Sequence, residues 1–362
     1  NYIEDLTIRG SWNVMAKSNN FRRALKCLKT CVLIFSLFFL VACGDASDEA
    51  YNSAIQKGLD VIASEKYEKA EAYFELALEE KPEDEKATAY LKQTKAFGIA
   101  QKAFDDNDFI NAVHNNPKLF TGFSDTTINH LMFYKLGIGT FYGPNFISDL
   151  AELDKEMLPY TRKTFLKYFE SHKEDYIESS NVWYEERTDF SMDAVGTSRV
   201  EHLEERGYEV LQGKGKCNGR LLGGCLESLY DILTSKRYDD EKAICEKYGL
   251  FPTLNEWKNK ILFIETSEEK PIPEVFEKEL IALKDTGVFD VINGIIVGKP
   301  QDEQYYEEYK EICYKVINDK DLPIMYNVNF GHAYPRCIIP YGIEAEIDLD
   351  KKIITLKESI FA

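Results

Sequence analysis

At 362 residues the chain is long enough for two or three domains, each with its own core. Hydrophobic residues make up 44% and aromatic residues 13% of the sequence, which excludes a disordered chain. The net charge of −18 argues against a nucleic-acid partner, and we interpret the acidic exterior mainly as a solubility feature.

The N-terminal region has the pattern of an export signal. Residues 1–14 precede the first methionine and receive no assignment. From Met15, a basic stretch without any acid leads into twelve uncharged residues, too few to span a bilayer. The next residues, Leu40-Val-Ala-Cys43-Gly44, resemble a bacterial lipobox, so we expect a lipoprotein-type signal peptide at 15–43. An ordinary secretory signal or a short buried helix is the alternative.

Lipidation of Cys43 would tether the protein to a membrane without a spanning helix. We therefore expect an extracytoplasmic, lipid-anchored protein. If the signal is not used, the part that follows stays cytoplasmic.

Residues 44–110 have a helical pattern. Gly58, Tyr67, Ala70, Phe74 and Ala77 occupy the positions at which a tetratricopeptide repeat has its small and aromatic packing residues. This predicts a helix pair broken near 64–66, with a third helix at about 85–104. We favour a helical spacer or cap over a partner-binding surface, because a single repeat is too little for a solenoid.

The next stretch contains a candidate nucleophile. A strand predicted at 118–121 runs into Gly122-Phe-Ser124-Asp125, and a helix is predicted at 126–135. Such a helix directs its N-terminal amides toward Ser124, which leaves the Asp125 N–H as a candidate oxyanion donor. A helix N-cap is the alternative role for Ser124.

Beyond this helix the pattern is less regular. Residues 140–144 predict a strand and turn with a structural role, and helices are predicted at about 149–153 and 159–169. The polar, aromatic-rich stretch 179–207, which includes Trp183, favours a loop between domains. It would either border a substrate cleft or be solvated surface.

The C-terminal part, from residue 214, alternates strands and helices. Asn218-Gly219 favours a turn, and Gly223-Gly224 favours the opening of a helix. This alternation predicts parallel strands joined by right-handed crossovers. The predicted strands are 260–264, 292–297 and 323–328, the helices between them are 273–285 and 302–317, and a closing hairpin spans 342–356.

Three predicted strands end at residues that suit acyl transfer. Ser124 follows the first, Glu265 the second and His332 the third, and open α/β sheets place working groups at strand ends. An alcohol, an imidazole and a carboxylate together favour a serine hydrolase. Glu268 and Glu269 compete with Glu265, whereas we expect structural roles for the other histidines, at positions 114, 130, 172 and 202.

Several motifs in order resemble the LD-carboxypeptidase family of serine peptidases, and most closely its microcin-immunity branch. They are Gly122-Phe-Ser-Asp-Thr126, Leu221-Leu-Gly-Gly-Cys-Leu226, Phe263-Ile-Glu-Thr-Ser-Glu-Glu269, Gly298-Lys-Pro-Gln301 and Asn329-Phe-Gly-His332 with Pro340-Tyr-Gly342. The resemblance covers about residues 111–362. It implies a catalytic triad of Ser124, Glu265 and His332, with neither metal nor organic cofactor.

The resemblance also implies a fold and a substrate. We expect an α/β protein: an N-terminal peptidase domain at 111–213 that lacks its first strands and a Gly-Gly loop, then a C-terminal domain at 214–362. The substrate would be a murein L,D-peptide or a microcin-type peptidyl-nucleotide, and a homodimer is a further expectation. The alternative is a lipid-anchored scaffold that carries an impaired peptidase remnant.

The eight cysteines have no metal-ligand spacing, so a zinc site is not expected. Cys217 and Cys225 could form a disulfide, or could remain free thiols.

Overall fold

The computed structural model describes residues 46–62, 64, 66–105, 113, 118–169 and 175–359. The chain divides into two compact units, residues 1–118 and 119–362. Residues 1–14, the predicted signal peptide and its Cys43 lie outside the described residues. None of the helices in the described ranges has the length and apolar character that crossing a bilayer requires.

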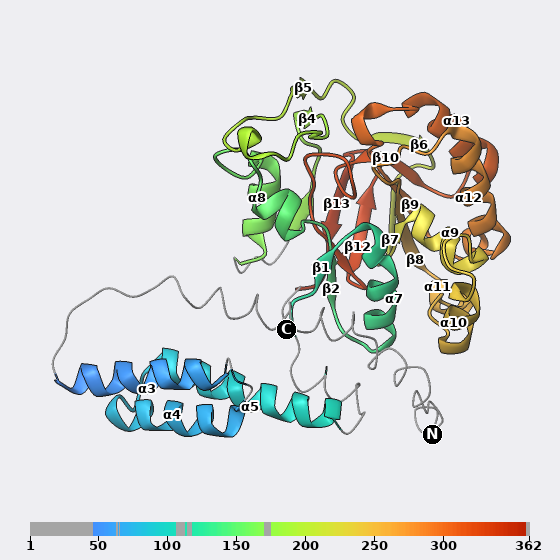
Figure 1. The fold of residues 1–362 in the computed structure, drawn as a ribbon. Coiled ribbons are helices and arrows are strands. Elements are labelled where there is room, and N and C mark those ends of the chain that lie inside the picture. Colours follow the sequence, from blue (N-terminus) through green and yellow to red (C-terminus); the bar gives the residue numbers. More distant parts are fainter. Residues whose placement is uncertain are drawn as a thin grey trace. The chain divides into compact units, whose positions relative to one another are not determined.

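The described residues of the first unit form three helices (Figure 1): α3 (Ala46–Ile62), α4 (Tyr67–Glu80) and α5 (Glu85–Asp105). Phe74 is fully buried, and a Cβ at Gly58 would stand 2.4 Å from its ring, so the small residue allows α3 and α4 to approach. Asp84 begins α5 by accepting the N–H of Ala87 at 2.7 Å. The predicted helix pair and third helix are confirmed, while their membership of a tetratricopeptide repeat stays a prediction.

The second unit is built on an eight-stranded sheet with the order β3-β13-β12-β7-β8-β9-β10-β6. The four consecutive strands from β7 to β10 are parallel, and the flanking strands pair antiparallel. The strands are β3 (Asp175–Ile177), β6 (Glu209–Gln212), β7 (Lys216–Cys225), β8 (Lys260–Glu265), β9 (Gly294–Gly298), β10 (Ile324–Val328), β12 (Glu344–Asp348) and β13 (Ile353–Leu356). The predicted α/β class and the closing hairpin are confirmed.

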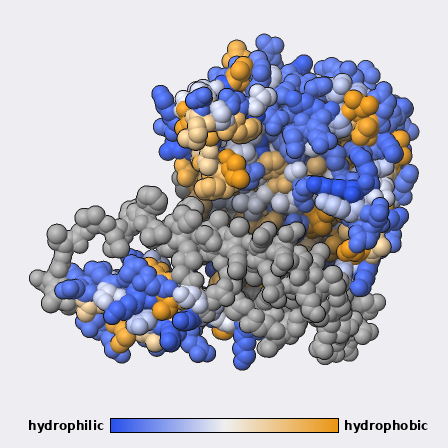
Figure 2. Space-filling model, in the orientation of Figure 1, coloured by the Kyte–Doolittle hydropathy of each residue, from blue (hydrophilic) through white to orange (hydrophobic). Residues whose placement is uncertain are grey.

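Helices cover one side of this sheet in Figure 1, where α9, α12 and α13 lie beside its parallel strands. Helix α9 packs against α10 and α12, and α12 packs against α13. The helices of this side are α9 (Leu226–Thr234), α10 (Glu241–Tyr248), α11 (Leu254–Trp257), α12 (Pro273–Asp285) and α13 (Tyr306–Ile317). The drawn face of the unit is mostly hydrophilic, with separate hydrophobic spots (Figure 2).

Two smaller sheets complete the second unit. The first has the order β1-β2-β11, so it joins the strands on either side of the helix at Thr127–Lys135 to the C-terminal part of the chain. The second is an antiparallel pair, β4 with β5, inside the stretch predicted as a loop. The elements are β1 (Thr121–Gly122), α7 (Thr127–Lys135), β2 (Thr140–Tyr142), α8 (Pro159–Lys167), β4 (Val182–Tyr184), β5 (Glu201–Leu203) and β11 (Ile339–Tyr341).

Three local predictions for this region need correction. The strand expected at 118–121 begins only at Thr121, and a π-helical turn at Phe146–Leu150 replaces the helix expected at 149–153. The loop expected throughout 179–207 is interrupted by β4 and β5, because Val182, Trp183 and Tyr184 are β-branched or aromatic and favour a strand.

The turn predicted at Asn218-Gly219 is wrong, because both residues lie inside β7. Gly223 and Gly224 also belong to β7, and the helix begins only at Leu226. These glycines serve close packing. A Cβ at Gly219 would stand 2.6 Å from the Asn259 carbonyl oxygen, and one at Gly223 only 1.7 Å from that of Phe263. Sequence patterns alone do not separate such glycines from turn glycines.

Cys217 and Cys225 are free thiols. Both lie in β7, and eight residues of extended strand separate them by roughly 26 Å, far beyond disulfide reach. The disulfide alternative is therefore wrong.

Candidate active site

Glu265 and His332 form the centre of the site. Glu265 ends β8 and His332 follows β10, so parallel strands deliver both residues to one edge of the sheet. Both side chains are buried, and His332 Nδ1 lies 2.7 Å from Glu265 Oε2. The His332 backbone N–H donates to the same oxygen at 3.2 Å. Glu265 thus fixes the imidazole from two sides.

Gly331 makes this approach feasible. Its φ of +84° lies in the region that favours glycine, and a Cβ there would stand 2.4 Å from Glu265 Cγ. Any other residue before His332 would push the carboxylate away from the ring.

Ser124 lies at the start of a short 3₁₀ turn, Ser124–Thr126, that continues into α7. Its φ of +62° is an unusual conformation for a residue with a side chain. Strained backbone of this kind occurs at nucleophiles held on a sharp strand-to-helix turn. The N-cap positions of the turn and of α7 are Phe123 and Thr126, so the N-cap alternative for Ser124 is not what the structure shows.

Tyr142 of β2 links the Ser124 turn to the Glu265 carboxylate. Its hydroxyl donates to Glu265 Oε1 at 2.5 Å and accepts the Ser124 N–H at 3.1 Å. In addition, the ring of Phe123 lies edge-on to the imidazole of His332, with 4.8 Å between the centroids. The three predicted residues are therefore brought to one site, and Tyr142 is a site residue that sequence reasoning missed.

The second imidazole nitrogen is bonded to Glu268. Within the described part of the chain, His332 Nε2 contacts Glu268 Oε2 at 2.8 Å and forms no hydrogen bond with Ser124. The Glu268 side chain is half-exposed. Glu268, which from the sequence competes with Glu265 for orienting the imidazole, lies on the opposite nitrogen. The expected serine–histidine hydrogen bond is thus replaced by a carboxylate contact.

The two carboxylates change the protonation of the base. Burial opposes a charge on the imidazole, but Glu265 and Glu268 together raise the pKa of His332 to about 10. The hydrogen bond from His332 in turn lowers the pKa of Glu268 to about 2. Both carboxylates thus favour the protonated imidazole, and Glu268 occupies the nitrogen that would take a proton from Ser124.

A Glu268→Gln variant tests this inference. Without the carboxylate the pKa of His332 falls, so the acidic limb of the kcat/KM profile moves to lower pH and activity at pH 7 rises. The measurement is the pH dependence of hydrolysis. Glu269→Gln, one residue further and exposed, is the matched control and keeps the wild-type limb. An unshifted limb in Glu268→Gln would show that this carboxylate does not control the base.

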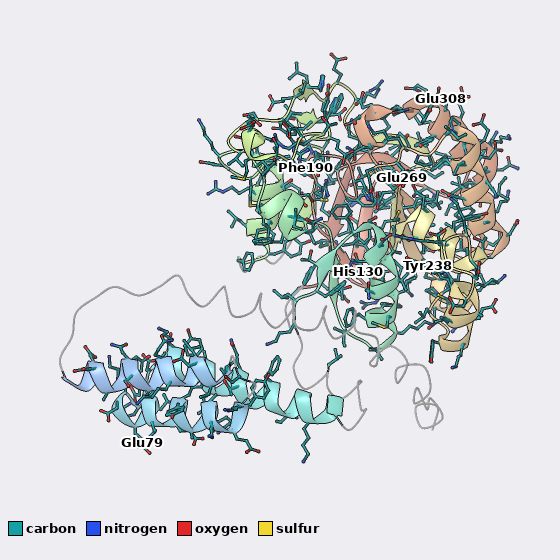
Figure 3. All side chains as sticks on the ribbon, in the orientation of Figure 1. Glu79, His130, Phe190, Tyr238, Glu269 and Glu308 are labelled. Carbon is teal, nitrogen blue, oxygen red and sulfur yellow. The ribbon has the colours of Figure 1, made fainter. Side chains whose placement is uncertain are left out.

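His130 supports the Ser124 turn, in agreement with the structural role predicted for this histidine. It is fully buried, with Nδ1 2.7 Å from Thr140 Oγ1 and Nε2 3.0 Å from the Gly122 carbonyl oxygen. Burial lowers the pKa of His130 to about 4, which keeps the ring neutral. Figure 3 labels His130 on α7.

The remaining candidates have less specific settings. His202 stacks on Trp183 with 4.2 Å between ring centroids and contacts Glu185 at 2.8 Å. Histidines 114 and 172 lie outside the described residues. Among the residues that the structure describes, no three His, Cys, Asp or Glu side chains are placed to hold a metal ion.

Asp125, the predicted oxyanion donor, is the second residue of the turn, where a backbone N–H has no partner within the helix. Its side chain points to solvent and pairs with Arg237. The backbone N–H is consequently placed beside Ser124, and its oxyanion role stays a prediction.

Comparison with known proteins places this site in a family. The LD-carboxypeptidase N-terminal domain matches residues 40–143, and the LD-carboxypeptidase C-terminal domain matches residues 218–347. The matched ranges begin at residue 40, whereas the resemblance based on motifs begins at about residue 111.

Three relatives agree with this match. An MccF-like protein from Streptococcus pneumoniae is 41% identical, with a TM-score of 0.67, 87% of this chain and 95% of that chain being covered. The microcin C7 self-immunity protein MccF of Escherichia coli is 29% identical, with 68% and 67% covered. The "Probable murein peptide carboxypeptidase" of Bacillus subtilis is 23% identical, with 76% and 74% covered. The chain therefore belongs to the LD-carboxypeptidase family.

Proposed function

We propose that this chain is a serine hydrolase that cleaves an amide bond, with Ser124 as nucleophile, His332 as general base and acid, and Glu265 as the group that orients His332. The observation that carries the proposal is the buried 2.7 Å contact between Glu265 and His332, joined through Tyr142 to the strained turn of Ser124. Each group is of the type that its role requires.

The reaction would proceed as follows. Substrate binding displaces Glu268 from Nε2, and the imidazolium then releases its Nε2 proton to water. The neutral imidazole takes the proton of the Ser124 hydroxyl as the Ser124 oxygen attacks the carbonyl carbon. The Asp125 N–H stabilises the oxyanion, a contribution worth on the order of a hundred- to a thousand-fold in rate. His332 then protonates the leaving amine, and water hydrolyses the acyl-enzyme by the same route.

For the substrate we propose a peptidyl-nucleotide of the microcin type. The Streptococcus pneumoniae relative was solved in complex with AMP, and the Escherichia coli relative is a self-immunity protein against microcin C7. A murein peptide is the second candidate, because the Bacillus subtilis relative carries that name.

The strand pair β4–β5 is the surface that would receive the part of the substrate remote from the scissile bond. It lies next to the site, because the Tyr184 N–H donates to the Tyr334 carbonyl oxygen at 3.1 Å, two residues after His332. Burial raises the pKa of Glu186, and the charge of His332 opposes that rise. The Trp183 ring there is half-buried, stacks on His202, and lies with its centre 5.2 Å from Lys299 Nζ.

The lipid anchor on Cys43 with an extracytoplasmic location, the cytoplasmic alternative and the homodimer all stay predictions. An external enzyme would meet murein peptides, whereas a cytoplasmic one would meet an imported peptidyl-nucleotide. The location of the protein therefore determines which of the two substrates it would meet.

A direct comparison of substrates tests the proposed function. The full chain is incubated with a peptidyl-nucleotide amide and with a murein tetrapeptide that ends in D-alanine, and products are followed by mass spectrometry. We expect kcat/KM to be at least tenfold higher for the peptidyl-nucleotide. The reverse preference would assign the enzyme to murein. Cleavage of neither substrate, with no reaction toward a fluorophosphonate, would leave the scaffold alternative.

A further inference from the structure

Arg336 is a buried charge that the proposed reaction does not use. Its side chain is fully buried four residues after His332, and its pKa stays above the ordinary value because Asp149 offsets the penalty of burial. Arg336 Nε lies 3.3 Å from Asp149 Oδ1. Within the described residues, Nε and Nη1 have no hydrogen bond of normal geometry. A buried guanidinium that is incompletely bonded costs stability, so its presence calls for a function.

Its contacts reach both halves of the proposed machinery. Arg336 Nη2 donates to the carbonyl oxygen of His332 at 2.8 Å. The guanidinium carbon lies 4.4 Å from the centre of the Phe123 ring, directly before Ser124 in sequence. That ring also touches the His332 imidazole edge-on. A single side chain is thus in contact with the turn of the nucleophile and the turn of the base.

Arg336 is also anchored outside these two turns. Asp149 belongs to the π-helical turn that follows β2, where its Oδ2 accepts the Asn145 N–H at 2.9 Å. On another side, the guanidinium lies 4.0 Å from the centre of the Tyr334 ring. Arg199 lies 3.7 Å from the same centre, and two guanidinium groups so close to one ring must occupy opposite faces. The stack therefore continues to Arg199, beside the strand pair β4–β5.

We propose that Arg336 is a positioning residue that clamps the Ser124 turn against the His332 turn, through the Phe123 ring and the His332 carbonyl. This role for Arg336 rests on the proposed hydrolase function. Arginine suits this task better than lysine, because its planar fork can stack on rings and donate in several directions at once.

A charge-neutral double variant provides the test. Arg336→Met alone would leave Asp149 as an unpaired buried charge, so Arg336→Met is combined with Asp149→Asn. Loss of the clamp is expected to lower kcat by about ten- to a hundredfold, as small misplacement of reacting groups does, while KM changes by less than about threefold. The fluorophosphonate labelling rate should fall in parallel. Folding is checked by circular dichroism.

Arg336→Lys is the second variant. It keeps a positive charge near Asp149 but cannot reproduce the stack and the bond to the His332 carbonyl together, so we expect an intermediate loss of kcat. If the double variant does not fold, Arg336→Lys decides. A kcat within about threefold of wild type in a folded variant would overturn the clamp.

Different results would contradict the hydrolase proposal and the Arg336 clamp. An inert wild-type protein would contradict the hydrolase proposal. The clamp would then be tested by a crystal structure of the double variant or, if that variant does not fold, of Arg336→Lys. A shift of Phe123 and His332 relative to one another would support the clamp, and an unchanged arrangement would refute it whatever the activity.

Discussion

Replacing Ser124 by alanine is expected to abolish hydrolysis, with kcat falling on the order of a million-fold or to the detection limit. The variant keeps a Cβ at the strained φ of +62°, so the turn and its bond to Tyr142 should persist. Only the hydroxyl is lost, and without it no acyl-enzyme can form. The residual rate reflects substrate binding and oxyanion donors alone.

The measurement is kcat on the preferred substrate, with Ser64→Ala as the matched control. Ser64 is an exposed serine between α3 and α4, in the first unit of the chain, and its loss should leave the rate unchanged. More than a tenth of the wild-type rate in Ser124→Ala would rule out this serine as the nucleophile.

Glu265→Gln should give the second largest loss, about ten-thousand-fold in kcat. The glutamine amide has nearly the same shape, but its NH₂ group cannot accept the Nδ1 proton of His332 and favours the wrong tautomer. The variant also removes the charge that supports the imidazolium formed during attack, so the pKa of His332 falls. The shape of the side chain is retained, while the carboxylate that orients and stabilises the His332 imidazole is lost.

The Glu265→Gln prediction is measured against Glu269→Gln, which removes a carboxylate four residues away. Glu269 is labelled in Figure 3 and is exposed, and we expect its loss to change kcat by less than about threefold. A loss below tenfold in Glu265→Gln would show that the buried carboxylate has a structural role only.

The sequence predicted those parts of the fold that local pattern controls. Strand 260–264 and helix 273–285 are found as β8 and α12, because an apolar run and a proline at the first helical turn are local signals. The strand at 323–328 is found as β10 for the same reason. Since parallel strands bring their carboxyl ends to one edge, the meeting of Glu265 and His332 could be predicted as well.

Other parts depend on tertiary contacts that no local pattern contains. From the sequence, Gly219 is typical of a turn and Gly223 of the start of a helix. In the structure both glycines allow neighbouring strands to approach. Tyr142 reads as a core residue of a short strand, and only the fold brings its hydroxyl to Glu265, 123 positions away. From the sequence, Glu268 is typical of a solvated charge after a strand. In the structure it contacts His332 Nε2, the nitrogen that would accept the Ser124 proton.

Covalent labelling shows whether Ser124, Glu265 and His332 act as one site. The full chain is treated with a fluorophosphonate, digested, and mapped by mass spectrometry. We expect one adduct, on Ser124, which forms far more slowly in Glu265→Gln and His332→Ala. A folded protein that reacts at a different serine, or does not react at all, would contradict this expectation.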